Sequence, residues 1–186
     1  MSASKPASLK EKAVMNIREP SAHIDYMLYE TRTQLVMFSQ MADSKANILL
    51  SISSVLVTLA LAKLTEPAWT LPIIVLVVFL LGAIFFALLA VIPSMNLLRS
   101  KKLDTRDPNF NTLFFGDYSR VPYREYLEHM EEVMNDPGRV YEAQVREIHS
   151  AGVYLQKTKY NYIKYGYILF FVGILFSLAL FVLSVM

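Results

Sequence analysis

Three long apolar runs dominate the hydrophobic pattern of this chain. Residues 46–62, 71–92 and 166–186 contain no Asp, Glu, Lys, Arg or His. As α-helices rising about 1.5 Å per residue, they extend roughly 26, 33 and 32 Å, close to the bilayer hydrocarbon thickness of about 30 Å. Three buried core helices would need a larger soluble shell than the remaining residues supply. The pattern therefore predicts an all-α integral membrane protein with three transmembrane helices.

Helix-breaking residues divide the rest of the chain. No Gly or Pro occurs between Ser21 and Glu66, so one uninterrupted helix is expected there, and a second is expected from Arg139 onward. Both would begin in the cytoplasm and continue into the membrane. The predicted order is a mobile tail, 1–20; a long helix containing span one, 21–64; span two, 71–93; a cytoplasmic segment with a short helix, 94–138; and a long helix containing span three, 139–186.

The positions of the basic residues predict the orientation. Of eighteen Lys and Arg residues, five precede Asp43 and eleven lie within 94–164, whereas only Lys63 lies between the first two spans and none follows the third. Basic residues flank membrane spans on the cytoplasmic side. We therefore expect the N-terminus and residues 94–164 in the cytoplasm and the C-terminus outside.

Polar side chains recur within the first apolar run. Asn47, Ser51, Ser54 and Thr58 are separated by four, three and four residues, so they share one helical face, which Gln40 continues one heptad earlier. Polar groups in hydrocarbon face neighbouring helices or water. One interpretation is helix packing, within or between subunits; the other is the lining of a water-filled path in an assembly.

Two charges stand where the first span begins. Asp43 and Lys45 lie on nearly opposite helical faces. We expect one of them to pair with a neighbouring helix in the resting state, where a costly charge that can be re-paired would suit a gate. The alternative is that Lys45 extends to the lipid headgroups.

Small residues mark one face of each of the other two spans. They are Gly166, Gly173, Ser177 and Ser184 on the third, and Ala83, Ala87 and Ala90 on the second. Small residues allow close helix approach in membranes. With the polar stripe, they suggest association beyond one bundle, and hence a homo-oligomer.

Catalytic chemistry is not evident in the sequence. There is no phosphate-binding loop, GxSxG, HExxH or cysteine. Glu125, His129 and Glu132 share a helical face that could bind a metal, although a solvated acidic face is the simpler interpretation. We therefore predict that the protein is not an enzyme and has no catalytic residues, no metal and no cofactor. The net charge of +2 gives no indication of nucleic-acid binding.

Three stretches carry a family resemblance: ADSKANILLSISS at the start of span one, NTLFFGDYS, and REIHSAGVYLQKTKYNYIKYGYILF leading into span three. With the EYLEHM helix they cover most of residues 25–175. The chain resembles the transmembrane effectors of the Pycsar anti-phage system, in which a partner cyclase makes cyclic CMP or cyclic UMP. The resemblance implies a bacterial inner-membrane protein that binds this nucleotide, impairs the membrane and stops growth.

The segment around LFFG offers groups suited to such a ligand. A cyclic nucleotide needs a guanidinium for its phosphate, an aromatic ring for its base and amide or carboxylate groups for the base edge. The candidates are Asn109, Asn111, Phe115, Asp117, Tyr118, Arg120 and Arg124. The competing interpretation is an ordinary loop that docks through Phe114 and Phe115. The alternative function, from another class, is a membrane scaffold or transporter subunit that senses no nucleotide.

Overall fold

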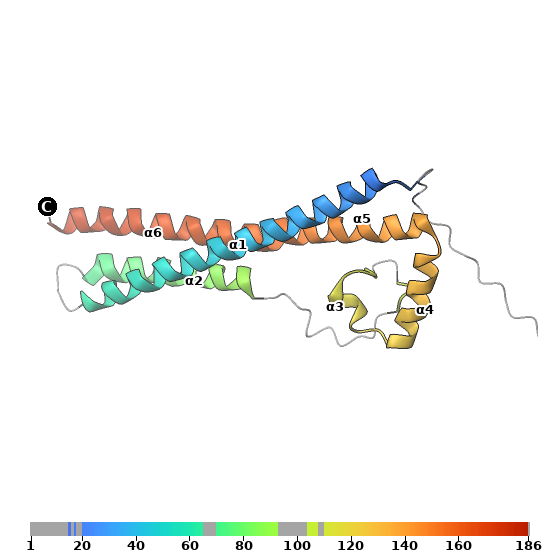
Figure 1. Ribbon diagram of the computed structural model, residues 1–186. Coiled ribbons are helices and arrows are strands. Elements are labelled where there is room, and N and C mark those ends of the chain that lie inside the picture. Colours follow the sequence, from blue (N-terminus) through green and yellow to red (C-terminus); the bar gives the residue numbers. More distant parts are fainter. Residues whose placement is uncertain are drawn as a thin grey trace, which may run out of the picture. The chain divides into compact units, whose positions relative to one another are not determined.

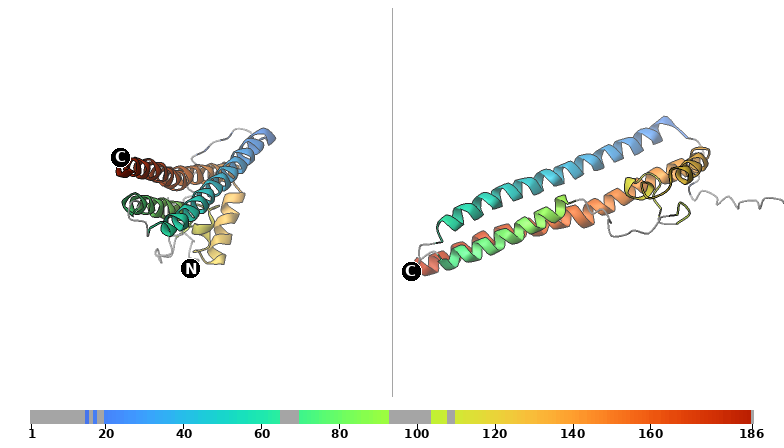
Figure 2. Two further views of the ribbon diagram at one scale, coloured as in Figure 1. Left: turned by 90° about the vertical axis from the view of Figure 1, so that its left-hand side faces the viewer. Right: turned by 90° about the horizontal axis from the view of Figure 1, so that it is seen from below.

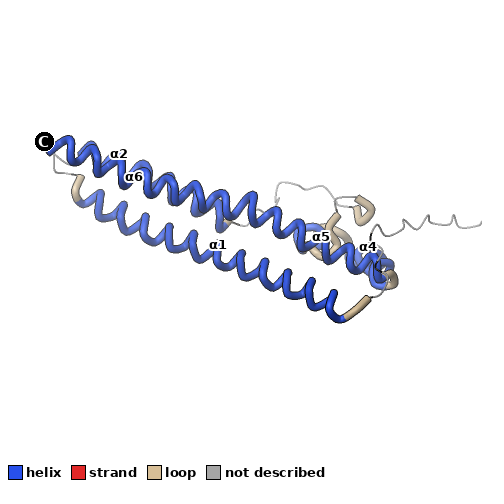
Figure 3. The backbone as a smooth tube through the Cα atoms, turned by 90° about the horizontal axis from the view of Figure 1, so that it is seen from above, coloured by secondary structure: helices blue, strands red, loops and turns tan. Residues whose placement is uncertain are grey.

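The computed structural model describes residues 15, 17, 20–64, 70–92, 104–107 and 110–185. Within these residues the regular structure is entirely helical (Figure 3). The elements are α1 (Ala22–Ala62), α2 (Thr70–Val91), α3 (Phe115–Tyr118), α4 (Tyr123–Met134), α5 (Pro137–Tyr154), the π-helix η2 (Leu155–Tyr160) and α6 (Asn161–Val185). Figure 1 labels the six α-helices. Most of the predicted tail, 1–20, lies outside the described residues.

The three predicted spans are confirmed as helices. Three helical stretches are long and apolar enough to cross a membrane: Ala22–Ala62, Thr70–Val91 and Pro137–Ser184. The first and third also contain the polar stretches that precede the spans, as the absence of helix breakers predicted. The all-α, three-span prediction is therefore correct.

By its internal contacts the chain divides into two compact units. The polar unit comprises Met1–Thr31 and Asn96–His149, and the membrane unit comprises Arg32–Met95 and Ser150–Met186. In the polar unit, the first turns of α1 are tied to α5 by a hydrogen bond of 2.7 Å from the Tyr141 hydroxyl to Asp25 Oδ1.

The core of the membrane unit is built from small residues. Helices α2 and α6 run side by side (Figure 2). The buried positions of α6 recur every three or four residues: Ile163, Gly166, Phe170, Gly173 and Ser177. A Cβ atom at Gly173 would overlap Phe79 of α2, so this glycine sets how closely the helices approach.

This packing changes one expectation drawn from the sequence. Gly166, Gly173 and Ser177 are buried within the chain, and so is the predicted alanine face of α2. The Ser177 hydroxyl donates to the Pro72 carbonyl at 2.9 Å. Ser184, the fourth residue of the predicted face on α6, is exposed, and its hydroxyl donates to the Phe181 carbonyl at 2.8 Å. The other six small residues pack inside the chain's own bundle, so they give no support to an oligomer.

The second long helix differs from the expected one at its start. It begins at Pro137, two residues before the predicted Arg139, because Asp136 caps it: the carboxylate accepts from the backbone N–H of Gly138 at 2.9 Å and of Arg139 at 3.4 Å. Proline suits the first helical position, where its missing N–H costs nothing.

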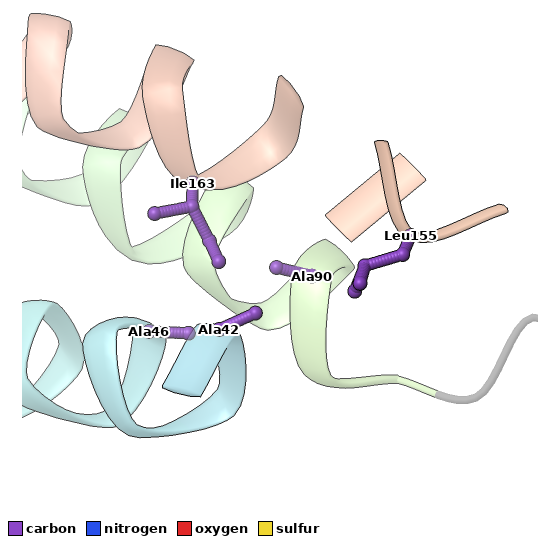
Figure 4. Packing of buried hydrophobic residues seen from close by; sticks show 5 residues of the cluster. All are labelled: Ala42, Ala46, Ala90, Leu155 and Ile163. Carbon is purple, nitrogen blue, oxygen red and sulfur yellow. The ribbon is translucent and has the colours of Figure 1, made fainter. Parts of the chain in front are cut away.

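The same helix contains a π-helical stretch, η2, between α5 and α6. Leu155 and Ile163 are eight residues apart, which in a regular α-helix would place them about 80° apart around the axis. If the wider π turn absorbs one residue, the angle falls to about 20°, and both side chains can face the same neighbours. Figure 4 shows them in one cluster with Ala42, Ala46 and Ala90.

Candidate functional site

The segment that follows Phe110 is fixed to α5 by one buried amide. Asn111 is only 5% exposed. Its Nδ2 donates to Glu147 Oε2 at 2.7 Å, its Oδ1 accepts from the Leu113 N–H at 3.2 Å, and its own N–H donates to Asp117 Oδ2 at 3.0 Å. Two candidate ligand-binding residues, Asn111 and Asp117, are thus brought together, but they hold the segment in place.

A second anchor joins this segment to α4. Thr112 Oγ1 lies 2.9 Å from His129 Nε2, and the Phe110 ring meets the imidazole edge-on at 5.4 Å between ring centroids. The Tyr126 hydroxyl donates to the Thr112 carbonyl at 3.2 Å. Nothing in the residue spacing links Thr112 to α4, so these partners could not be predicted from the sequence.

Burial shifts the titration of both α4 side chains. It lowers the pKa of His129, an effect that Arg139 reinforces and Glu132 opposes. The imidazole is therefore neutral at pH 7. Burial also raises the pKa of Tyr126, which keeps its hydroxyl protonated as a donor.

No metal site forms on this face of α4 as far as the structure describes it. Among the described residues, no three His, Asp or Glu side chains converge as metal ligands. Glu125 Oε1 instead lies 3.4 Å from both the backbone N and the hydroxyl of Thr105.

The remaining candidates are more accessible. Phe115 is 54% exposed and contacts Phe114 at a centroid distance of 5.1 Å. Tyr118 is partly exposed and stacks on Tyr126 at 5.3 Å. The Arg124 side chain is 91% exposed and pairs with Glu128 one turn along α4, at 3.3 Å. Arg120 is half-buried, and Asn109 lies outside the described residues.

An ion pair joins α1 to the π-helix in the membrane unit. Lys159 Nζ donates to both Asp43 oxygens at 2.8 Å and to Ser39 Oγ at 2.9 Å. The Lys159 side chain is 13% exposed and that of Asp43 is 38% exposed. Of the two charges at the start of span one, Asp43 is thus the one that pairs with another helix. The sequence did not indicate which lysine near the start of span three would be its partner.

Lys45 has a different environment. Its ammonium lies 6.0 Å from the centroid of the Tyr160 ring, a cation–π arrangement. The Tyr167 hydroxyl donates to the Lys45 carbonyl at 3.2 Å, and the Tyr160 hydroxyl donates to the Phe38 carbonyl at 3.3 Å. Tyrosines from η2 and α6 therefore hold α1 on both sides of Asp43.

The polar stripe of α1 does not pack on the chain's own helices. Asn47, Ser51, Ser54 and Thr58 are all exposed. The Ser54 hydroxyl donates to the Leu50 carbonyl at 2.7 Å, and the Thr58 hydroxyl donates to the Ser54 carbonyl at 3.0 Å. Packing within one chain is therefore wrong for this face. Packing between subunits and the lining of a water-filled path both stay predictions.

The sequence of these elements matches one known family. The model described as the Pycsar effector protein domain matches residues 27–185, which include all three spans and the anchored segment between them. Comparison with curated proteins and with solved structures gives no significant match. Because the matched region is well over half of the chain, the protein belongs to the Pycsar effector family, the membrane effectors of anti-phage defence.

Proposed function

We propose that the protein is activated by a cyclic pyrimidine nucleotide, cyclic CMP or cyclic UMP, made by a partner cyclase. Activation impairs the integrity of the bacterial inner membrane and stops growth. The observation that carries this proposal is the family match, because one domain spans both the anchored segment and the three membrane helices. The nucleotide acts as a signal, and the role requires no catalysis and no cofactor.

The proposed binding groups are those that the internal anchors leave accessible. Arg124 offers a guanidinium for the phosphate, because its ion-pair partner Glu128 is an exposed carboxylate on the same helix. Phe115 and Tyr118 offer aromatic faces for the base. Arg120 remains a second candidate for the phosphate. Asn111 and Asp117 contribute indirectly, by holding this segment in shape.

The proposed orientation follows the basic residues, with the N-terminus and residues 94–164 in the cytoplasm, where the cyclase product accumulates. The mechanism is a shift of population. The nucleotide binds the disrupting arrangement more tightly than the resting one, and its effect is limited by that difference in affinity.

Leakage from liposomes tests this proposal. Purified protein is reconstituted, and dye release is followed after addition of cyclic CMP, UMP, AMP or GMP. We expect release with a cyclic pyrimidine alone, and at least a tenfold higher nucleotide requirement in Arg124→Ala. Arg146→Ala is the control, because Arg146 also pairs with a carboxylate one turn away, Glu142 on α5, at 3.2 Å.

Two results would contradict the proposal. If no nucleotide releases dye and none binds by calorimetry, the protein is a scaffold or transporter subunit instead. If Arg124→Ala and Arg146→Ala behave alike, Arg124 is not the phosphate ligand, and Arg120 becomes the residue to change.

A further inference from the structure

Helix α1 carries two opposite faces within the membrane unit. One is buried and consists of Ala42, Ala46, Leu49, Ser53 and Ala60. The first three of these pack in clusters with residues of α2, η2 and α6. The other, the polar seam, is exposed at every position: Met37, Gln40, Ser44, Asn47, Ser51, Ser54 and Thr58. The seam positions alternate in steps of three and four, and the two faces are offset by about half a helical turn.

The spacing of the polar seam is that of a helix–helix contact. A repeat of 3.5 residues keeps one face against a partner helix over several turns, with a slight left-handed supercoil. The seam keeps this repeat over three heptads. A lipid-facing surface has no partner helix to follow, so nothing about lipid exposure would favour such a repeat.

The chemistry of the seam also argues against lipid as its neighbour. From Asn47 to Thr58 it passes through the apolar run, where lipid offers no hydrogen-bond partner. Ser54 and Thr58 bond to carbonyls of their own helix, which leaves their oxygen lone pairs available. An amide such as that of Asn47 needs donors and acceptors from outside α1.

The side chains on this part of α1 are also spaced as in a helix–helix contact. They border a shallow, largely open depression lined by Met37, Gln40, Met41, Ser44, Lys45 and Ile48. The first four are residues i, i+3, i+4 and i+7, the arrangement that receives one side chain of a partner helix in knobs-into-holes packing.

We propose that the polar seam binds the same seam of α1 in a second copy of this chain. The side chains of the seam are uncharged, and Lys45, which lies beside the seam, has its ammonium 6.0 Å from the Tyr160 ring of its own chain, so the seam itself brings no like charges together. Asn, Gln, Ser and Thr each both donate and accept, so they can pair with themselves. All copies insert with the same orientation, which makes the helices parallel and brings each seam residue close to its own equivalent.

The inference rests on the proposed function in taking α1 as a membrane span, and it specifies how the effector assembles. The contact itself requires no nucleotide. In larger rings, polar groups brought together along the axis would let water replace lipid there, so the same surface would link self-association to leakage.

Disulfide cross-linking tests the seam directly, because the chain contains no cysteine. Ser51→Cys and Thr58→Cys place a thiol on the seam. Ile52→Cys and Leu59→Cys place it one residue away, on exposed positions about 100° around the helix. The full-length variants are oxidised in native membranes without nucleotide, and we expect covalent dimers from the two seam positions only.

A second change measures the polar contribution. Asn47→Leu, combined with Ser51→Cys, is expected to weaken self-association roughly 3- to 30-fold, the range of hydrogen bonds between membrane helices. Asn47→Gln should retain most of the cross-linking, because it keeps the amide.

Several outcomes would overturn the inference: no dimer from the seam positions, equal yields from Ile52→Cys and Leu59→Cys, or a product whose mass shows a different protein. Nucleotide-triggered leakage by the same variants under reducing conditions is scored separately. Leakage without a seam cross-link would overturn this inference alone, whereas a cross-link without leakage would count only against nucleotide activation.

Discussion

Neutralising Asp43 should loosen the membrane unit and favour its active arrangement. Lys159 donates to both carboxylate oxygens at 2.8 Å and is only 13% exposed. In Asp43→Asn the lysine keeps Ser39, at 2.9 Å, and one amide oxygen. It loses its counter-charge while staying largely out of water, which is the costly part of the change.

The size of the effect follows from the geometry. At 2.8 Å and an effective dielectric of about 20, the direct attraction is roughly 6 kcal/mol. Dehydration of both groups cancels much of it. Fully buried pairs lose about 3–5 kcal/mol when broken, and Asp43 is 38% exposed, so we expect about 1–3 kcal/mol.

Thermal unfolding in detergent micelles measures this loss. At about 3 °C per kcal/mol for a chain of this size, Asp43→Asn should lower Tm by about 3–9 °C. Asp43→Leu with Lys159→Met, which removes both charges, should recover most of it. In liposomes without nucleotide, the single variant should leak more, because 1–3 kcal/mol shifts a two-state equilibrium by about 5- to 150-fold.

A double-mutant cycle decides whether the pair matters. Asp43→Leu and Lys159→Met are made singly and together, and the three variants are compared with the unchanged protein at equal protein levels. A coupling energy below about 0.5 kcal/mol would show that the two charges act independently. Unchanged leakage with a clearly lowered Tm would refute the gate while leaving the pair as a structural contact.

Three other contacts can each be tested with substitutions at a single residue. Gly173→Ala should cost about 1–3 kcal/mol in unfolding free energy, because the new methyl would overlap Phe79 near its backbone, whereas Gly82→Ala, which meets only a leucine tip, should be nearly neutral by the same melt. Ser53→Ala should be neutral or raise Tm slightly, because this hydroxyl is fully buried without a hydrogen-bond partner. The pKa of His129 is lower in the folded state than in the unfolded state, so protonation below about pH 6.5 favours unfolding. Protection of α4 against hydrogen exchange should therefore be full above about pH 6.5 and fall as the pH drops towards the folded-state pKa. His129→Gln should abolish this dependence.

The spans could be predicted because they depend on composition alone. Apolar length identifies a membrane helix without any knowledge of its neighbours. The start of the second long helix was misplaced because Asp136-Pro137 both stops one helix and caps the next. Here the capping hydrogen bond determines the boundary, because the residue types alone are compatible with a helix that begins at Pro137 or at Arg139.

The partners at the candidate site depend on the folded chain. Asn111 meets Glu147 across thirty-six residues of sequence, and no local pattern connects them. Several basic residues near the start of span three could have paired with Asp43, and the structure shows that Lys159 does. The π turn changes which side of the helix faces α1, so the sequence alone does not indicate this partner. The exposed stripe was recognisable because its period is a local property of one helix.

The π-helix also affects where the chain can change its length in related proteins. It leaves the second long helix one residue longer than its packing requires. Without the π turn, Leu155 and Ile163 would share a face if they were seven residues apart, whereas they are eight apart. Losing one residue inside Leu155–Tyr160 would therefore be tolerated. A loss inside α6 would instead rotate the buried positions beyond it by about 100° relative to those before it, and so turn them away from α2. Length differences among members of this family should accordingly gather at this stretch.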